Sequence, residues 1–201
     1  MDSFKYLGVT ITNNLTWSHH INIVCTKARK MLGLIYRHFY VNCNSDALLK
    51  LYLSLVRPRL EYACQVWSPQ AVTQISQIER VQKLAIKIVS KEWNINYYVH
   101  LTEFQIPTLQ RRRSELSLCL LYKISRSGCY FPEGLIVRKP PSSYVTRSSC
   151  RFLLIQPFVK TSSHLNSFIP HTISLWNSLP SHVTNSPTFT SFKSLLSSCN
   201  L

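Results

Sequence analysis

The stretch FKYLGVTITNNLTWSHHI, residues 4–21, changes from a strand pattern to the start of a helix. Asn13-Asn14 favours a turn between the two, and Ser18 is placed to cap a helix that begins at His19. The strand pattern consists of aromatic and β-branched residues at Phe4, Tyr6, Val9 and Ile11. It predicts one short strand or half of a hairpin. Because such an element is marginally stable alone, we expect it to dock on the helices that follow or on something absent from this sequence.

The next segment, from 19 to about 40, has the period of an amphipathic helix. Lys27, Lys30 and Arg37 fall away from its apolar stripe, which predicts one buried and one basic face. The stripe consists of Ile21, Val24, Cys25, Ala28, Leu32, Ile35 and Phe39.

A second helix, capped by Ser45, is apolar nearly all round and is predicted to be central and buried. Pro58 lacks an N–H and restricts Arg57, so we expect this helix to end or kink there. The following LEYACQVW, residues 60–67, can resume helix before Pro69.

Two further helices are predicted, from about 72 to 90 and from Pro107 to about Ser125. The inward positions are predicted at Ile75, Ile78, Val81, Leu84, Ala85 and Ile88 in one, and at Leu116, Leu120, Leu121 and Ile124 in the other.

Beyond Gly128 the chain becomes rich in Pro, Ser and Thr. We expect loops over 126–167 with one or two short strands, for example at 151–155, and short helices near 170–178 and 188–198. The predicted fold is mainly α: a helical bundle with a short N-terminal β strand or hairpin and an irregular Pro/Ser-rich C-terminal region.

The composition is that of a basic globular protein. The 201 residues are 45% hydrophobic and contain 23 Lys and Arg against 8 Asp and Glu, for a formal charge of +15. This excess favours a nucleic acid or another anionic partner. Seven cysteines without a C-x-x-C pair argue against a zinc site and against a disulfide framework. With no signal peptide and no membrane-spanning stretch, the expected location is intracellular, with nucleus and cytoplasm left open.

Catalytic signatures are absent from the sequence. No two of the eight acids are spaced as a metal-binding pair, and no Gly-rich phosphate loop is present. His19-His20 is interpreted as a solvated helix start rather than a ligand pair, and Cys64 as a packing residue rather than a nucleophile.

Several blocks of the sequence, in this order along it, resemble the C-terminal portion of LINE-type, jockey-like non-LTR retrotransposon reverse transcriptases. The blocks are FKYLGVTI with LTWSHHI, SLVRPRLEYACQVWSP, IERVQKLAIKIV, PTLQRRR, and NSFIPHTISLWNSLP with FTSFKSLL. They cover nearly the whole chain.

The resemblance implies that Tyr6, Leu7 and Gly8 occupy the primer-grip strand pair, the last element of the palm. It also implies three parts: a palm edge at 1–16, a helical thumb and connection at 17–127, and a C-terminal segment at 128–201. The family's Tyr-x-Asp-Asp and its upstream Asp, which bind Mg²⁺, have no counterpart here. The expectation is therefore a non-enzymatic piece of a truncated element or incomplete reading frame, without a cofactor of its own, whose packing partner is the missing palm.

The candidate nucleic-acid-binding residues are Lys27, Lys30, Arg80, Lys83, Lys87, Arg111, Arg112 and Arg113. The first five form one groove wall if the first and third predicted helices pack side by side; the alternative is solvated faces. The three consecutive arginines span most of a helix circumference, so at least one must meet a partner, an acid or the apolar side. They are interpreted as phosphate contacts, with a solvated helix end screened by Glu115 as the alternative.

The expected function is sequence-independent binding of template–primer or RNA by a reverse transcriptase fragment. Two alternatives stay open: a co-opted RNA- or DNA-binding module, and an unselected fragment without function. The oligomeric state is not determined by the sequence.

Overall fold

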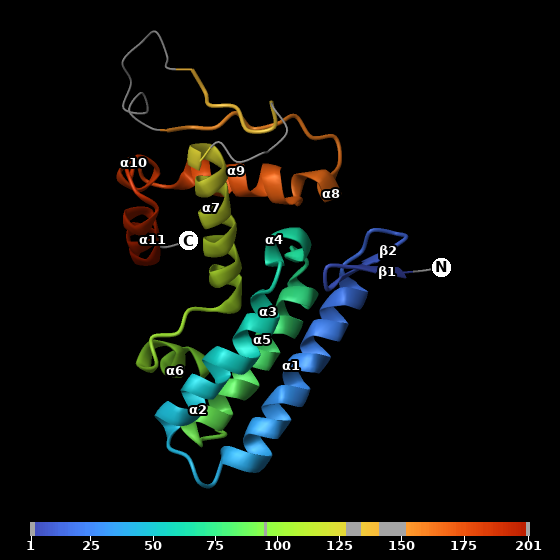
Figure 1. Cartoon of the computed structure of the whole chain (residues 1–201), viewed down its shortest axis with the longest axis vertical. Helices are drawn as coiled ribbons and strands as arrows, with labels where there is room; N and C mark the ends of the chain where they lie inside the picture. The colour runs from blue at the N-terminus through green and yellow to red at the C-terminus, as the bar shows by residue number, and fades with distance from the viewer. Residues whose placement is uncertain (1–2, 95, 128–133, 141–151, 200–201) are drawn as a thin grey trace. The chain divides into compact units, whose positions relative to one another are not determined.

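The computed structural model describes residues 3–94, 96–127, 134–140 and 152–199. The chain forms two compact units, Met1–Arg112 and Arg113–Leu201 (Figure 1). The boundary between the units falls inside a helix, whereas the sequence division places the C-terminal segment after residue 127. The three-part functional division stays a prediction.

Unit 1 begins with a complete hairpin. Strand β1, Ser3–Tyr6, pairs antiparallel with β2, Val9–Thr12, in the register that joins Tyr6 to Val9. Leu7 and Gly8 form the turn with φ of 43° and 87°, the left-handed conformation that two-residue hairpins require. The sequence predicted either a single strand or part of a hairpin, and the structure shows a hairpin. The hairpin contacts the following helix through a hydrogen bond in which Thr10 N–H donates to His20 Nδ1.

The first long helix, α1, spans Ser18–Phe39. The predicted stripe is buried except for Val24, which is half-buried, and Phe39, which is 41% exposed.

The predicted cap at Ser18 is wrong. Trp17 is the N-cap residue and makes no side-chain capping bond, while the Ser18 hydroxyl accepts from Gln74 at 2.8 Å.

The second helical stretch has three parts: α2 at Ser45–Leu51, a π-helical turn η1 at Tyr52–Val56, and α3 at Arg57–Glu61. Its cap is Asn44, whose side chain accepts from Ala47 N–H, so the prediction of Ser45 is wrong. The helix does not end at Pro58 as one of the two alternatives expected. A π turn precedes Pro58, since proline cannot supply the α-helical N–H to residue 54, and α3 continues through it to Glu61. Ala63, at φ 50°, then turns the chain into α4, Cys64–Trp67.

Helix α5, Val72–Ser90, lies alongside α1 and α2 (Figure 1). Its predicted inner face is buried, with Ile86 and Val89 added and with Ile75 and Leu84 half-buried. Lys91 ends α5 in the left-handed conformation, and a short helix that the sequence did not indicate, α6, spans Tyr97–Glu103.

Helix α7, Leu109–Ser127, begins two residues after Pro107 and crosses the unit boundary. The predicted inward position Leu120 is wrong: it is 36% exposed, and Leu118 is fully buried instead. Of the other predicted positions, Leu121 is buried and Leu116 and Ile124 are half-buried.

The rest of unit 2 is short helices: α8 at Ser162–Leu165, α9 at Phe168–Ser178, α10 at Ser181–Thr184 and α11 at Phe189–Ser198. Both predicted terminal helices are confirmed. They pack with α7 around Tyr122, Trp176 and Phe192. Within the described residues, the expected strand near 151–155 is reduced to one bridge between Arg138 and Leu154; Arg151 lies outside them.

The mainly α fold with a short N-terminal hairpin is therefore confirmed. No helix among the described residues is both long enough and apolar enough to cross a membrane.

Candidate nucleic-acid interface

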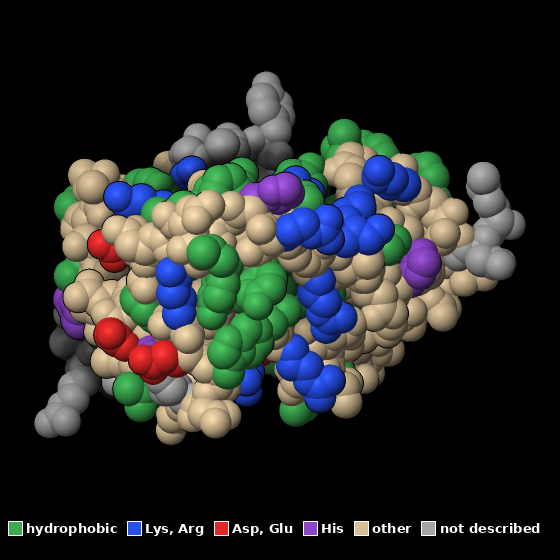
Figure 2. Space-filling view, turned by 90° about the horizontal axis from the view of Figure 1, so that it is seen from below, with side chains coloured by type: hydrophobic (Ala, Val, Ile, Leu, Met, Phe, Trp, Pro, Cys, Tyr) green, Lys and Arg blue, Asp and Glu red, His purple; other side chains and the backbone are tan. Residues whose placement is uncertain are grey.

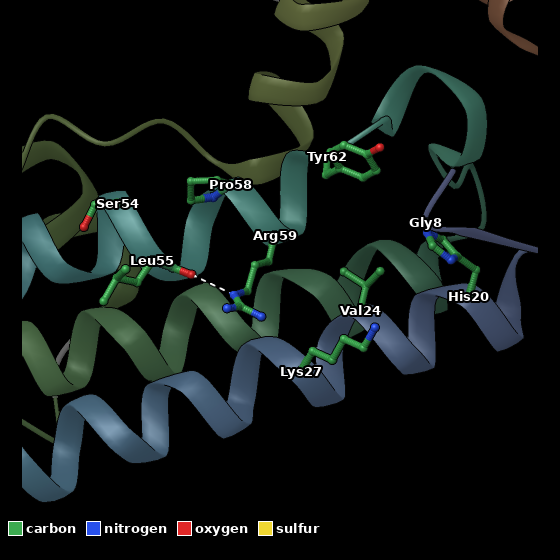
Figure 3. A pocket seen from close by; sticks show the side chains of 9 residues that line it. All are labelled: Gly8, His20, Val24, Lys27, Ser54, Leu55, Pro58, Arg59 and Tyr62. Atoms are coloured by element: carbon green, nitrogen blue, oxygen red, sulfur yellow. Dashed lines mark hydrogen bonds between the residues drawn. The ribbon is translucent and has the colours of Figure 1, made fainter. Parts of the chain in front are cut away.

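The candidate interface is a groove of about 450 Å³ in unit 1, open to solvent between α1, the η1–α3 stretch and the hairpin turn (Figure 3). Its lining contains two cations and no carboxylate. The lining residues are Gly8, His20, Val24, Lys27, Ser54, Leu55, Pro58, Arg59 and Tyr62.

The two cations come from different helices. Lys27 extends from α1, and Arg59 extends from α3 across the same groove (Figure 3). Arg59 Nε donates to the Leu55 carbonyl oxygen at 3.1 Å, which holds the guanidinium along the groove wall. Both side chains are exposed. Two positive charges from different helices, in a lining that contains no carboxylate, suit a phosphate-bearing ligand.

The hairpin turn closes one end of this groove. Tyr62 Oη donates to the Leu7 carbonyl oxygen at 2.8 Å. A Cβ built on Gly8 would lie 3.3 Å from Tyr62 Cε1, a tight contact, so the turn passes close to the ring. The three residues predicted as a primer grip, Tyr6, Leu7 and Gly8, thus lie at or beside the groove, with Tyr6 59% and Leu7 75% exposed.

His20 lies under the turn and corrects one prediction. His19 is exposed, as expected of a solvated helix start, but His20 is only 3% exposed and packs edge-on against Trp67. Burial lowers the pKa of His20, and the charge of Lys27 lowers it further. Because Nδ1 accepts from Thr10 N–H, the neutral ring carries its proton on Nε2, which is buried without a hydrogen-bond partner.

The other predicted lysines and Arg80 do not join this groove. Helices α1 and α5 pack side by side, as the groove-wall prediction required. However, Arg80 and Lys83 line a second hollow of about 410 Å³ together with Glu79, Tyr97 and Tyr98. The Lys83 ammonium lies 5.1 Å from the centre of the Tyr97 ring. Lys30 is exposed on α1 and Lys87 is half-buried on α5.

The arginine run is divided among three environments. Arg112 donates to both carboxylate oxygens of Glu61, Nε at 3.0 Å and an Nη at 3.1 Å. Arg113 is 2% exposed and Arg111 is half-buried. The prediction that at least one arginine meets an acid or the apolar side is confirmed, and Arg112 and Arg113 are poorly placed to receive a phosphate.

Arg59 and Tyr62 are groove residues that the sequence did not single out. Both fall inside the block SLVRPRLEYACQVWSP. The available signal was the pair of arginines that flank Pro58 within a mostly apolar helix.

Comparison with known proteins gives one relative. No protein-family model matches the chain, and no solved structure matches it. Over 165 residues the chain is 26% identical to a probable RNA-directed DNA polymerase from transposon X-element of Drosophila melanogaster. The alignment covers 72% of this chain and 17% of that protein, so the chain spans about a sixth of the relative's length. The resemblance predicted from the sequence blocks is confirmed: the chain is similar to part of a probable RNA-directed DNA polymerase from a transposon.

Proposed function

We propose that this chain is a thumb-like part of an RNA-directed DNA polymerase, which binds the sugar–phosphate backbone of a template–primer duplex without reading its sequence. The observation that carries the proposal is the groove beside the hairpin turn, whose lining contains Lys27 from α1, Arg59 from α3 and no carboxylate. The similarity to a transposon RNA-directed DNA polymerase supports the choice of ligand.

Electrostatics is the expected source of affinity. Each Lys or Arg that neutralises a phosphate releases condensed counterions, so the binding constant falls steeply with salt. Contacts to phosphates and sugars position a protein on a duplex but carry no base information. The proposed role is therefore holding and orienting the duplex.

We further propose that the chain performs no nucleotide transfer by itself. Metal-assisted phosphoryl transfer uses carboxylates that hold Mg²⁺ against the reacting phosphates. The eight acids of this sequence include no closely spaced pair and no Tyr-x-Asp-Asp motif. Incorporation of deoxynucleotides by the purified chain, measured with a primed RNA template and Mg²⁺, would contradict this proposal.

The binding proposal is tested by fluorescence anisotropy with a labelled blunt RNA–DNA hybrid over a series of salt concentrations. The wild-type chain should bind in or below the ~10⁻⁴ to 10⁻⁶ M range of non-specific contacts. The Lys27→Ala/Arg59→Ala variant should bind more weakly, and its slope of log K against log salt should be shallower by about 2.

The matched control is Lys160→Ala/Lys193→Ala, which removes the same charge from two exposed positions of unit 2. It should change the slope less than the groove variant does. If the two double variants behave alike, the overall charge and not the groove governs binding. If the folded wild-type chain does not bind the hybrid at low salt, the proposed function fails.

A further inference from the structure

A cluster of exposed aromatic side chains lies at the other end of α1 from the hairpin. Trp93 is 48%, Tyr36 44% and Phe39 41% exposed, and Tyr40 is half-buried beside them. Figure 2 views the chain from the end where α1 runs into α2, and there hydrophobic side chains gather beside Lys and Arg side chains. Exposed apolar patches of this kind mark interaction sites, because leaving large rings in water is unfavourable.

The rings hold one another in place. Tyr36 and Tyr40 lie 4.6 Å apart between ring centres, and Trp93 meets Tyr36 edge-on at 6.3 Å. Trp93 reaches the last turns of α1 because Lys91 ends α5 in the left-handed conformation, at φ 59°. The side chains come from two segments that are far apart in the sequence, so the cluster is a product of the fold.

Positive charge borders the rings. The Lys91 ammonium lies 5.6 Å from the centre of the Tyr40 ring, and Arg37, the residue after Tyr36 in α1, is exposed. The adjacent acid, Glu92, lies 3.8 Å from His100 on α6. Stacking faces for bases beside cations for phosphates are the two components of single-strand binding surfaces.

We propose that Tyr36, Tyr40 and Trp93, with Arg37 and Lys91, bind an unpaired nucleic-acid strand, with at least one base stacked on Trp93. We call these five residues the aromatic platform. The charge on its border distinguishes this ligand from an apolar protein partner, which would leave Arg37 and Lys91 without counter-charges. The platform is separate from the Lys27–Arg59 groove and does not depend on the function proposed for it.

Tryptophan fluorescence provides a local readout. Of the four tryptophans, Trp67 and Trp176 are fully buried and Trp17 is half-buried near the hairpin. A single-stranded oligouridylate should therefore quench the wild-type emission mainly through Trp93. Trp93→Ala should remove the quenching and weaken binding of the oligouridylate by roughly 5- to 150-fold, the range for one lost stacking contact. Trp93→Phe should retain most of the affinity.

Three controls separate the platform from the groove and from folding. Phe158→Ala, which removes an 84% exposed ring in unit 2, should leave binding unchanged. Trp93→Ala should change the affinity for a blunt RNA–DNA hybrid by less than about twofold. Lys27→Ala/Arg59→Ala should weaken hybrid binding and keep the quenching by oligouridylate, so that failure of the groove and failure of the platform are distinguishable.

Two results would overturn the proposal. The first is equal affinity of wild type and a folded Trp93→Ala variant for the oligouridylate. The second is a concentration-dependent dimer, seen by sedimentation, that Tyr36→Ala and Trp93→Ala dissociate without any change in strand binding; the platform would then join two copies of the chain.

Discussion

Gly8 is the residue at which the hairpin turn and the groove meet. Its φ of 87° is costly for any residue with a Cβ, and the space where that Cβ would stand is bounded by the Tyr62 ring. The same ring donates its hydroxyl hydrogen to the Leu7 carbonyl. The position of the turn over the groove therefore depends on the absence of a side chain at residue 8.

Gly8→Ala is expected to destabilise unit 1 by about 1–2 kcal/mol, because alanine is strained at this φ and must push the Tyr62 ring away. Urea unfolding followed by circular dichroism measures the change. Gly33→Ala is the matched control: Gly33 lies within α1 and has no atom within 4 Å of an added Cβ. That substitution should stabilise the chain by about 0.5–1 kcal/mol. Equal effects at the two positions would show that the turn does not need a glycine.

His20 makes unit 1 sensitive to acid. Because burial lowers its pKa in the folded chain below the ordinary 6.5, the unfolded chain binds more protons between those two values. The free energy of unfolding should then be fully retained above about pH 6.5 and should fall as the pH drops toward the lowered pKa. The measurement is urea unfolding at several pH values between about 7.5 and 5.

His20→Gln removes the titrating group, and its stability should depend less on pH over this range. His171, whose pKa is also lowered by burial, is present in both proteins and cancels in the comparison. Identical pH dependence in the two proteins would show that His20 is not the group that titrates.

At the scale of elements, a chain of hydrogen bonds that starts at a buried tyrosine and reaches the surface ties unit 1 together. Tyr52 Oη donates to Gln82 Oε1 at 2.7 Å, and Gln82 Nε2 donates to the Pro107 carbonyl at 3.0 Å and to Tyr97 Oη at 3.1 Å. Tyr97 in turn donates to Glu79, which also accepts from Gln110 N–H. Burial raises the pKa of both tyrosines far above the ordinary value, so both stay donors. The chain thereby connects η1, α5, α6 and the start of α7.

Gln82→Leu should destabilise unit 1 by roughly 2–4 kcal/mol, because it removes the partner of the buried Tyr52 hydroxyl and of the half-buried Pro107 carbonyl. Chemical denaturation with circular dichroism detection measures the loss. Gln74→Leu, on the same helix but with only an exposed bond to Ser18, should change the stability by less than about 1 kcal/mol. A comparable loss in both variants would mean that the hydrogen bonds of Gln82 contribute little to stability.

At the scale of the whole molecule, the positive charge is divided between the two units. Residues 1–112 carry 14 Lys and Arg against six acids, and residues 113–201 carry nine against two. Both units therefore attract an anionic ligand, and the groove and the aromatic platform supply the local geometry in unit 1. The core of unit 2 is a separate cluster in which Phe192 stacks on Tyr122 and Trp176.

Separate cores predict separate local stability. Phe192→Ala should cost about 3–5 kcal/mol, and it should speed amide hydrogen exchange in α9 and α11 while leaving α1 and α5 unchanged. Ile78→Ala, in the core of unit 1, should do the reverse. Mass spectrometry of peptides from each helix distinguishes the two patterns. Faster exchange in every helix of both units in either variant would mean that the chain unfolds as one cooperative body.

The sequence by itself determined the local structure and the resemblance. The stripe from Ile21 to Ile35 predicts α1 because helical period is a property of neighbouring residues, and Pro58 predicts the disturbance that appears as η1. The blocks from FKYLGVTI to FTSFKSLL, which carry the resemblance, are also contiguous stretches that can be compared without knowing the fold. The sequence pattern was less reliable where tertiary contacts compete, as at Ser18, which bonds Gln74, and at Leu120, which is exposed while Leu118 is buried.

Only the tertiary structure decided which charges share a surface. It placed Lys27 and Arg59 in the lining of one groove, paired Arg112 with Glu61, and covered His20 with the hairpin. It also brought Trp93 against Tyr36 at the end of α1. Helical period assigns a residue to a face of its own helix but does not specify which helix packs against that face. The site therefore depends on contacts between residues distant in sequence, which the packing of the apolar stripes fixes.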